Sequence, residues 1–161
     1  MSVNPIPPNC NSVNLSLVVK DANGAIELYK RAFGATGGAC LNAPDGSVMH
    51  AEIQIGNSTI MLGEENEQWG MISAESMGGS PISIMLYVDD CDATFQQAID
   101  AGCEVISPVA DMFWGDRHGR LKDPFGYQWG IATHIEDVSE EEMDRRGKAW
   151  LEEMSQGKPE S

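Results

Sequence analysis

The chain has 161 residues and a mass of 17.5 kDa, which suits one compact domain or two small modules that share a core. Its 25 acidic and 10 basic residues give a formal charge of −15. This charge opposes binding to phosphate backbones and anionic membranes, because such binding rests on lysine and arginine contacts. We therefore expect no nucleic-acid partner and no membrane partner.

Several features of the sequence indicate a cytoplasmic protein. The N-terminus has neither the basic nor the apolar region of a signal peptide, and no apolar run approaches the ~20 residues that span a bilayer. Four cysteines are present and show no CxxC spacing, so reduced, buried thiols are expected at Cys10, Cys40, Cys91 and Cys103.

The first half of the chain has the pattern of a β-α-β-β-β module, expected over residues 12–62 after a proline-rich leader, 1–11. The extended run NLSLVVKD ends at Asp21, a residue able to cap a helix. The next stretch, ANGAIELYKRAFGA, has apolar residues at helical spacing, with Gly34 placed to end the helix. Three β-like segments follow, separated by turn residues, at 36–42, 48–55 and 58–62.

The same order of elements returns in the second half. A polar, glycine-rich connection, 63–81, is predicted to be a linker or lid, and a second module is expected over 82–134. It consists of a strand, a helix and three strands at 82–90, 91–102, 103–109, 116–122 and 127–133. Asp90 lies 69 residues after Asp21, and at that offset the two predicted helices nearly coincide. The sequence therefore indicates an internal duplication.

The tail, residues 135–161, has the pattern of one more helix. Ser139 and Glu142 have the spacing of a capping box, and apolar residues recur along one side of the segment that follows. We expect this helix to dock on the body of the protein or on a partner chain.

Two such modules, the second closing with a DPFG turn before an aromatic strand, resemble the vicinal oxygen chelate superfamily. This superfamily includes glyoxalase I, bleomycin resistance proteins, fosfomycin resistance enzymes and extradiol dioxygenases. The stretches VVKDANGAIELYKRAFGA, VMHAEIQIGNSTIML, SPISIMLYVDD and FWGDRHGRLKDPFGYQW are similar to its PhnB-like, glyoxalase-like group. The resemblance implies an α+β fold whose curved mixed sheets form a cup around a small molecule, with helices on the convex side, and frequently a homodimer.

Strand alternation assigns residues to the two faces of each predicted sheet. One parity is apolar throughout and is expected to face the helices: Leu15, Leu17, Val19, Ile60, Leu62, Ile84, Leu86, Val88, Trp129 and Ile131. The opposite parity and the following loop supply the predicted ligand-binding residues: Asn14, Ser16, Met61, Ser83, Met85, Tyr87, Phe113, Trp114, Arg120 and Gln128. Phe113 and Trp114 fit a pocket and a core position equally well, and Asp116 and Arg117 are expected to pair at the mouth of the cup or simply to lie on the surface.

The resemblance also locates the positions where metal-dependent relatives carry their ligands. In this chain they correspond to Asn14, Met61, Ser83 and Gly130. A catalytic divalent site takes histidine nitrogens and carboxylate oxygens, and these four residues do not supply them. We therefore predict that the usual metal site is absent and that no cofactor is bound, with a divalent metal as the alternative.

Three other polar residues are weak catalytic candidates. His50 and Glu52 alternate on one predicted strand, and His118 lies on another, all with the parity of the cup. They are interpreted as hydrogen-bonding groups of the pocket or of a dimer interface, or else as acid-base groups or unusual metal ligands.

Three functions are compatible with this pattern. The first is a protein that binds a small aromatic or cationic molecule in the cup without catalytic metal. The second is a lyase, isomerase or dioxygenase-like enzyme of the same superfamily, and the third is a stress or regulatory interaction protein with a vestigial cup. The sequence contains no GxSxG elbow, P-loop or GxGxxG motif to favour another chemistry.

Overall fold

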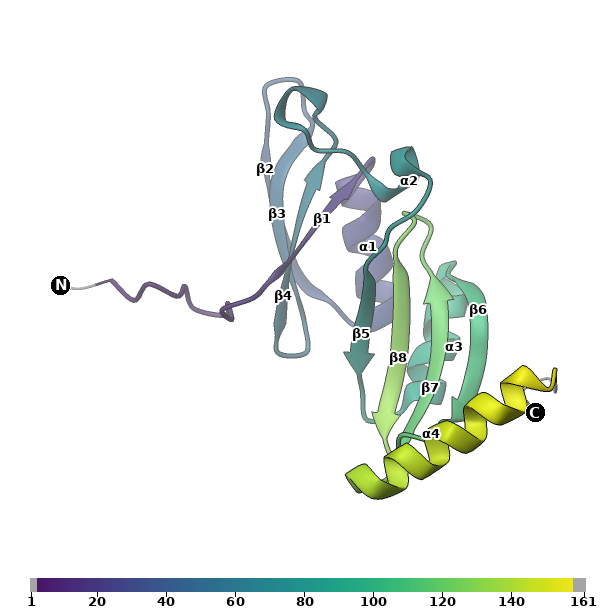
Figure 1. The fold of residues 1–161 in the computed structure, drawn as a ribbon. Helices are drawn as coiled ribbons and strands as arrows, with labels where there is room; N and C mark the ends of the chain where they lie inside the picture. Colours follow the sequence, from purple (N-terminus) through teal and green to yellow (C-terminus); the bar gives the residue numbers. More distant parts are fainter. Residues whose placement is uncertain (1–2, 158–161) are drawn as a thin grey trace.

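The computed structural model describes residues 3–157, so residues 1–2 of the expected leader and 158–161 of the expected tail lie outside the described part. The first module contains, in chain order, β1 (Leu15–Val19), α1 (Ala22–Phe33), β2 (Thr36–Asn42), β3 (Val48–Ile55) and β4 (Ser58–Glu64). Its four strands form one sheet in the order β1-β4-β3-β2, with β1 parallel to β4 and the other pairs antiparallel (Figure 1).

The second module repeats this arrangement. It contains β5 (Ser83–Tyr87), α3 (Cys91–Ala101), β6 (Glu104–Asp111), β7 (Asp116–Lys122) and β8 (Gln128–His134). The sheet order is β5-β8-β7-β6, which corresponds strand for strand to the first sheet. The predicted α+β fold with two β-α-β-β-β modules is therefore confirmed. The connection between the modules holds a short 3₁₀ turn, η1 (Glu67–Trp69), and a one-turn helix, α2 (Ala74–Met77).

Matching signals start both main helices. The side chain of Asp21 accepts a hydrogen bond from the Gly24 amide at 2.8 Å, and Asp90 accepts one from the Ala93 amide at 3.0 Å. Each cap satisfies a backbone donor that has no partner inside the helix. The predicted duplication is thus present in the local chemistry of the helix termini as well as in the order of the strands.

The hydrophobic core lies on the side of each sheet that the helices cover. Helices α1 and α3 contact each other, so the two halves share one core. The residues predicted to face the helices belong to it: Leu17, Val19, Ile60, Leu62, Trp129 and Ile131 are buried, and Leu15, Ile84, Leu86 and Val88 are half-buried against them. We call the other side of each sheet, which no helix covers along its length, the open face.

The DPFG turn joins the two modules through a buried carboxylate. Asp123 is 2% exposed, and its Oδ1 accepts hydrogen bonds from the amides of Phe125 and Tyr127 at 2.9 and 3.0 Å. Its Oδ2 accepts from the Tyr29 hydroxyl of α1 at 2.7 Å and from the Trp129 indole at 2.8 Å. Because Tyr29 belongs to the first module, this one side chain ties the modules together.

Each sheet has two edge strands in the described residues, β1 and β2 in the first sheet and β5 and β6 in the second. β1 is paired only with β4, and β5 only with β8. The Tyr127 hydroxyl bonds both backbone groups of Val18, at 2.8 Å to the carbonyl and 3.2 Å from the amide, and so closes one end of the β1 edge. None of the helices between residues 3 and 157 has the length and apolar character needed to cross a membrane.

Candidate functional site

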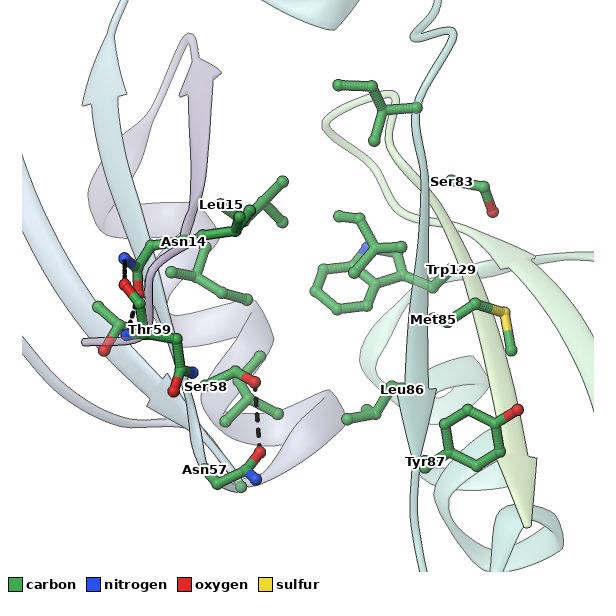
Figure 2. A pocket seen from close by; sticks show the side chains of 17 residues that line it. Asn14, Leu15, Asn57, Ser58, Thr59, Ser83, Met85, Leu86, Tyr87 and Trp129 are labelled. Atoms are coloured by element: carbon green, nitrogen blue, oxygen red, sulfur yellow. Dashed lines mark hydrogen bonds between the residues drawn. The ribbon is translucent and has the colours of Figure 1, made fainter. Parts of the chain in front are cut away.

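An apolar groove separates the free edges of β1 and β5, and we call it the edge groove. Its volume is about 500 Å³, and Trp129 forms part of its wall together with Leu15, Ile60 and Leu86. Figure 2 shows Leu86 and Trp129 on the groove side of β5, whereas Ser83, Met85 and Tyr87 project from the other side of the strand. Alternation along β5 thus points Leu86 into the edge groove, whereas Ser83, Met85 and Tyr87 contribute to its rim and point toward the open face of the second sheet.

At the entrance of the edge groove, Asn14 is already occupied by local hydrogen bonds. Its side-chain amide donates to the Asn11 carbonyl at 2.6 Å, and its Oδ1 accepts from the Asn11 amide at 3.0 Å. The predicted ligand-binding role of Asn14 is therefore limited by the N-terminal segment, which the side chain holds in place.

The open face of the second sheet collects most of the other predicted binding residues. Ser83, Met85 and Tyr87 are exposed on β5, while His118 and Arg120 on β7 and Gln128 on β8 are half-buried. These residues share one surface of the sheet, and their role in ligand binding stays a prediction. That surface combines apolar and aromatic side chains with a few polar ones, a composition typical of small-molecule sites.

Gly130 lies in the middle of this open face, opposite both Met85 and Arg120 in the strand register. A β-carbon at position 130 would lie 2.4 Å from Met85 Sδ and 2.8 Å from His118 Nε2. The volume in which a metal-dependent relative would present a ligand side chain is therefore filled by Met85 and His118. A side chain at position 130 would have to displace the flexible ends of Met85 and His118.

Asp116 organises the end of the same open face, at the start of β7. Its buried carboxylate accepts hydrogen bonds from the Tyr87 hydroxyl at 2.7 Å, the Trp114 indole at 3.0 Å and His134 Nδ1 at 2.8 Å. Burial raises the pKa of Asp116, but these three hydrogen bonds outweigh burial and lower it below its ordinary value. Asp116 is therefore ionised at neutral pH and fixes the orientation of Tyr87 and Trp114.

The predicted ion pair between Asp116 and Arg117 is wrong. Adjacent residues on a strand point to opposite faces, so the Arg117 side chain points away from Asp116. It pairs with Asp92 at 2.6 Å and with Asp111 at 2.9 Å. The sequence offered no signal for the cluster around Asp116, because its donors come from β5, the turn before β7 and the end of β8.

The two aromatic residues before Asp116 have different surroundings. Phe113 packs against Trp150 of the C-terminal helix α4 (Glu140–Ser155), with ring centroids 5.7 Å apart. Trp114 lies edge-on to Phe113 at 5.1 Å and to His118 at 5.9 Å. Phe113 is therefore part of the packing under α4, whereas Trp114 adjoins the open face.

Helix α4 docks on the second module of its own chain, across one end of the sheet (Figure 1). Ser139 caps it by accepting from the Glu142 amide at 3.3 Å. The Glu142 carboxylate does not close the predicted capping box. It pairs instead with Arg145 at 2.6 Å and Arg146 at 2.7 Å, and Arg146 also reaches Glu136 at 2.8 Å.

The open face of the first sheet carries fewer of the predicted site residues. Ser16 and Glu52 both lie opposite Met61 in the strand register, and His50 Nε2 lies 3.0 Å from Glu52 Oε1. His50 and Glu52 are exposed and belong to a different sheet from His118. Within residues 3–157, no three histidine, cysteine, aspartate or glutamate side chains are grouped closely enough to hold a metal ion, so one chain does not assemble these residues into a metal site.

The residues at the superfamily's ligand positions do not fit a divalent metal. Asn14 is engaged by Asn11, Met61 offers a thioether, Ser83 a neutral hydroxyl, and position 130 has no side chain. We therefore assign no chemical step to a metal at these positions. The four cysteines are free thiols, of which only Cys91 and Cys103 are buried as expected.

The end of the open face is predicted to respond to pH through His134. Hydrogen bonds to Asp137 and Asp116 raise its pKa above the ordinary value of 6.5. A group whose pKa is higher in the folded state than in the unfolded state stabilises the fold when it is protonated. This contribution is complete at pH values below the unfolded-state pKa, and it is lost as the pH rises through the folded-state pKa. Asp116 stays ionised over this range because its own pKa is lowered.

We therefore expect wild-type protein to melt at a higher temperature than a His134→Gln variant at about pH 5.5, and the difference to shrink by about pH 8.5. Thermal unfolding followed by circular dichroism at both pH values checks this. A difference that is constant or grows with pH would contradict the assignment.

Comparison with known proteins agrees with the fold. The family model of the Glyoxalase/Bleomycin resistance protein/Dioxygenase superfamily matches residues 11–131, and the chain belongs to this superfamily. A protein of Mycobacterium tuberculosis named only as uncharacterized is 38% identical over 130 residues, covering 79% of this chain and 76% of that protein.

Two solved structures illustrate the shared architecture. The crystal structure of TioX from Micromonospora is 23% identical, covers 77% of this chain and 100% of that chain, and superposes with a TM-score of 0.60. The fosfomycin resistance protein FosX from Mesorhizobium loti is 14% identical, covers 76% and 91%, and has a TM-score of 0.55. At these identities the likeness concerns the fold alone.

Proposed function

We propose that this protein binds a small organic molecule without using the superfamily's catalytic metal, and that it is a member of the PhnB-like group acting in the cytoplasm. The open face of the second sheet carries the proposal. Met85, Tyr87 and Trp114 supply apolar and aromatic surface there, and His118 and Arg120 supply polar anchors. The four free thiols suit a reducing compartment.

We further propose that the binding cup is built by two copies of the chain. Helices α1 and α3 pack together, so each sheet presents its open face to solvent, and the edges of β1 and β5 have no strand partner in the described residues. Free strand edges next to an apolar groove favour association with another chain. A second copy that covers the edge groove would bring the first sheet of one chain opposite the second sheet of the other.

The experiment that tests the binding function compares two exposed methionines. Met85 lies on the open face of the second sheet and is 48% exposed, whereas Met77 lies in α2 and is 66% exposed. We expect small aromatic molecules to raise the melting temperature of the wild type and of Met77→Ser. Binding to Met85→Ser is expected to be roughly tenfold weaker, because apolar contact area is lost.

Equal ligand-induced shifts in the two variants would contradict binding at the open face. Metal analysis of the same purified protein tests the second part of the proposal, since stoichiometric zinc, nickel, manganese or iron would contradict the metal-free assignment.

One observation favours an enzymatic alternative. Burial, followed by the charge of Arg120, lowers the pKa of His118, so a neutral imidazole faces the proposed cup at neutral pH and is able to accept a proton. Catalysis through His118 would require turnover of a bound ligand that is lost in His118→Asn while binding persists.

A further inference from the structure

Arg120 differs from the other half-buried cations between residues 3 and 157 because it has no acidic partner. Four lysines and arginines between residues 3 and 157 are half-buried, and three of them, Lys30, Arg117 and Arg146, pair with carboxylates. Arg120, the fourth, has no carboxylate within ion-pair distance in this part of the chain, although the protein has 25 acidic residues. A half-buried charge loses hydration, and an opposite charge offsets that loss.

The guanidinium is nevertheless held in a defined position. Its Nη2 donates to Gln128 Oε1 at 2.6 Å, a neutral acceptor on the neighbouring strand. In the strand register Arg120 lies between Gly130 of β8 and Ser107 of β6, two small residues. The remaining guanidinium donors have no hydrogen-bond partner within residues 3–157, and a planar guanidinium is suited to bidentate binding of a carboxylate.

The surface beside Arg120 suits an aromatic ring. Residues two apart on a strand project from the same face about 7 Å apart, which places His118 next to Arg120. The ring of His118 also lies close to that of Trp114, with ring centroids 5.9 Å apart. A half-buried imidazole thus has a cation as its neighbour on the strand and an indole beside its ring, a combination suited to an aromatic acid.

We propose that Arg120 binds the carboxylate of a small aromatic acid whose ring lies over His118 and Trp114. This inference rests on the proposed binding function and specifies its ligand class. The net charge of −15 attracts cations at long range, but that field governs association rates more than local recognition. A guanidinium that is held in one position and has no acidic partner in the described part of the chain favours an anionic group at this point of the open face.

The test uses 2-naphthoate and its neutral counterpart 2-naphthalenemethanol as probes, with affinities measured by isothermal titration calorimetry on the full chain. We expect the wild type to bind naphthoate at least about tenfold more tightly than the alcohol. Arg120→Gln should abolish this preference by lowering the affinity for naphthoate to about that for the alcohol, and an unchanged melting temperature would show that the fold is intact. Arg120→Lys should restore part of the preference.

Lys122→Gln is the matched control, because Lys122 lies on the same strand and face but is exposed. We expect it to retain the preference for naphthoate. If Arg120→Gln and Lys122→Gln lost the preference for naphthoate equally, the preference would come from general attraction by charge, and the inference would be overturned. Equal binding of both probes by the wild type would also overturn it. A shift in dimer dissociation with unchanged preference in Arg120→Gln would also overturn it, because Arg120 would then pair with a second copy.

Absence of binding by both probes would overturn the inference as well. The broader binding function would survive that result if other molecules still raised the melting temperature in a manner that depends on Met85.

Discussion

Replacing Asp123 with asparagine is expected to lower the free energy of unfolding by about 2 to 3 kcal/mol. Asparagine keeps the volume but replaces one carboxylate oxygen by an amide group that donates. Each oxygen of Asp123 accepts two hydrogen bonds, from Phe125 and Tyr127 at Oδ1 and from Tyr29 and Trp129 at Oδ2. Whichever way the amide is turned, two buried donors lose their acceptor.

Two considerations set the size of this effect. An unsatisfied buried donor costs about 1 to 3 kcal/mol, so two of them give a large loss. Burial raises the pKa of Asp123 despite its hydrogen bonds, which means that removing the charge offsets part of the loss. Because Tyr29 lies in the first module and Asp123 in the second, the loss should destabilise both modules together.

Urea unfolding measures this effect, with Asp90→Asn as the matched control. Asp90 caps α3 and is exposed, and asparagine caps helices about as well as aspartate, so its free energy of unfolding should stay within about 0.5 kcal/mol of the wild type. If Asp123→Asn unfolded at the same urea concentration as Asp90→Asn, the proposed link between the modules would be wrong.

A charge placed in the edge groove is expected to dissociate the proposed dimer. Ile82 lines the groove just before β5 and is 53% exposed in the single chain, so glutamate should be tolerated by the fold itself. In a dimer that covers the groove the same carboxylate would be buried without a partner. We expect a cost of about 3 kcal/mol, or roughly a hundredfold increase in the dissociation constant.

Sedimentation equilibrium checks this, because wild-type protein should have twice the mass of the 17.5 kDa chain. Ile72→Glu is the control: Ile72 is 50% exposed, nearly as much as Ile82, but lies in the connection between the modules and does not line the groove. A monomeric wild type, or dissociation by Ile72→Glu to the same degree, would exclude a dimer formed through the edge groove.

Much of the fold was predictable because its signals are local. Strand alternation assigned Leu17, Trp129 and their neighbours to the core, and the aspartate caps together with the repeat indicated the duplicated order of elements. The same alternation brought Met85, His118 and Arg120 to one face. The residue types at the superfamily's ligand positions also argued against a metal without any coordinates.

Other features depend on atoms that are distant in the sequence. The pairing of Arg117 with Asp92 and Asp111, instead of Asp116, follows from which face of β7 meets α3 and β6. The role of Asp123 as a link between modules requires the position of Tyr29, which lies 94 residues away in the chain. Neither spacing nor composition carries that information.

By itself the sequence determined the duplicated α+β modules and the core face of each strand, because periodicity and side-chain chemistry are properties of short segments. Only the tertiary structure decided that the helices pack between the two halves and that, within residues 3–157, the edges of β1 and β5 stay free and Arg120 has no acidic partner. These depend on distances between segments, which are set by how the modules pack in space.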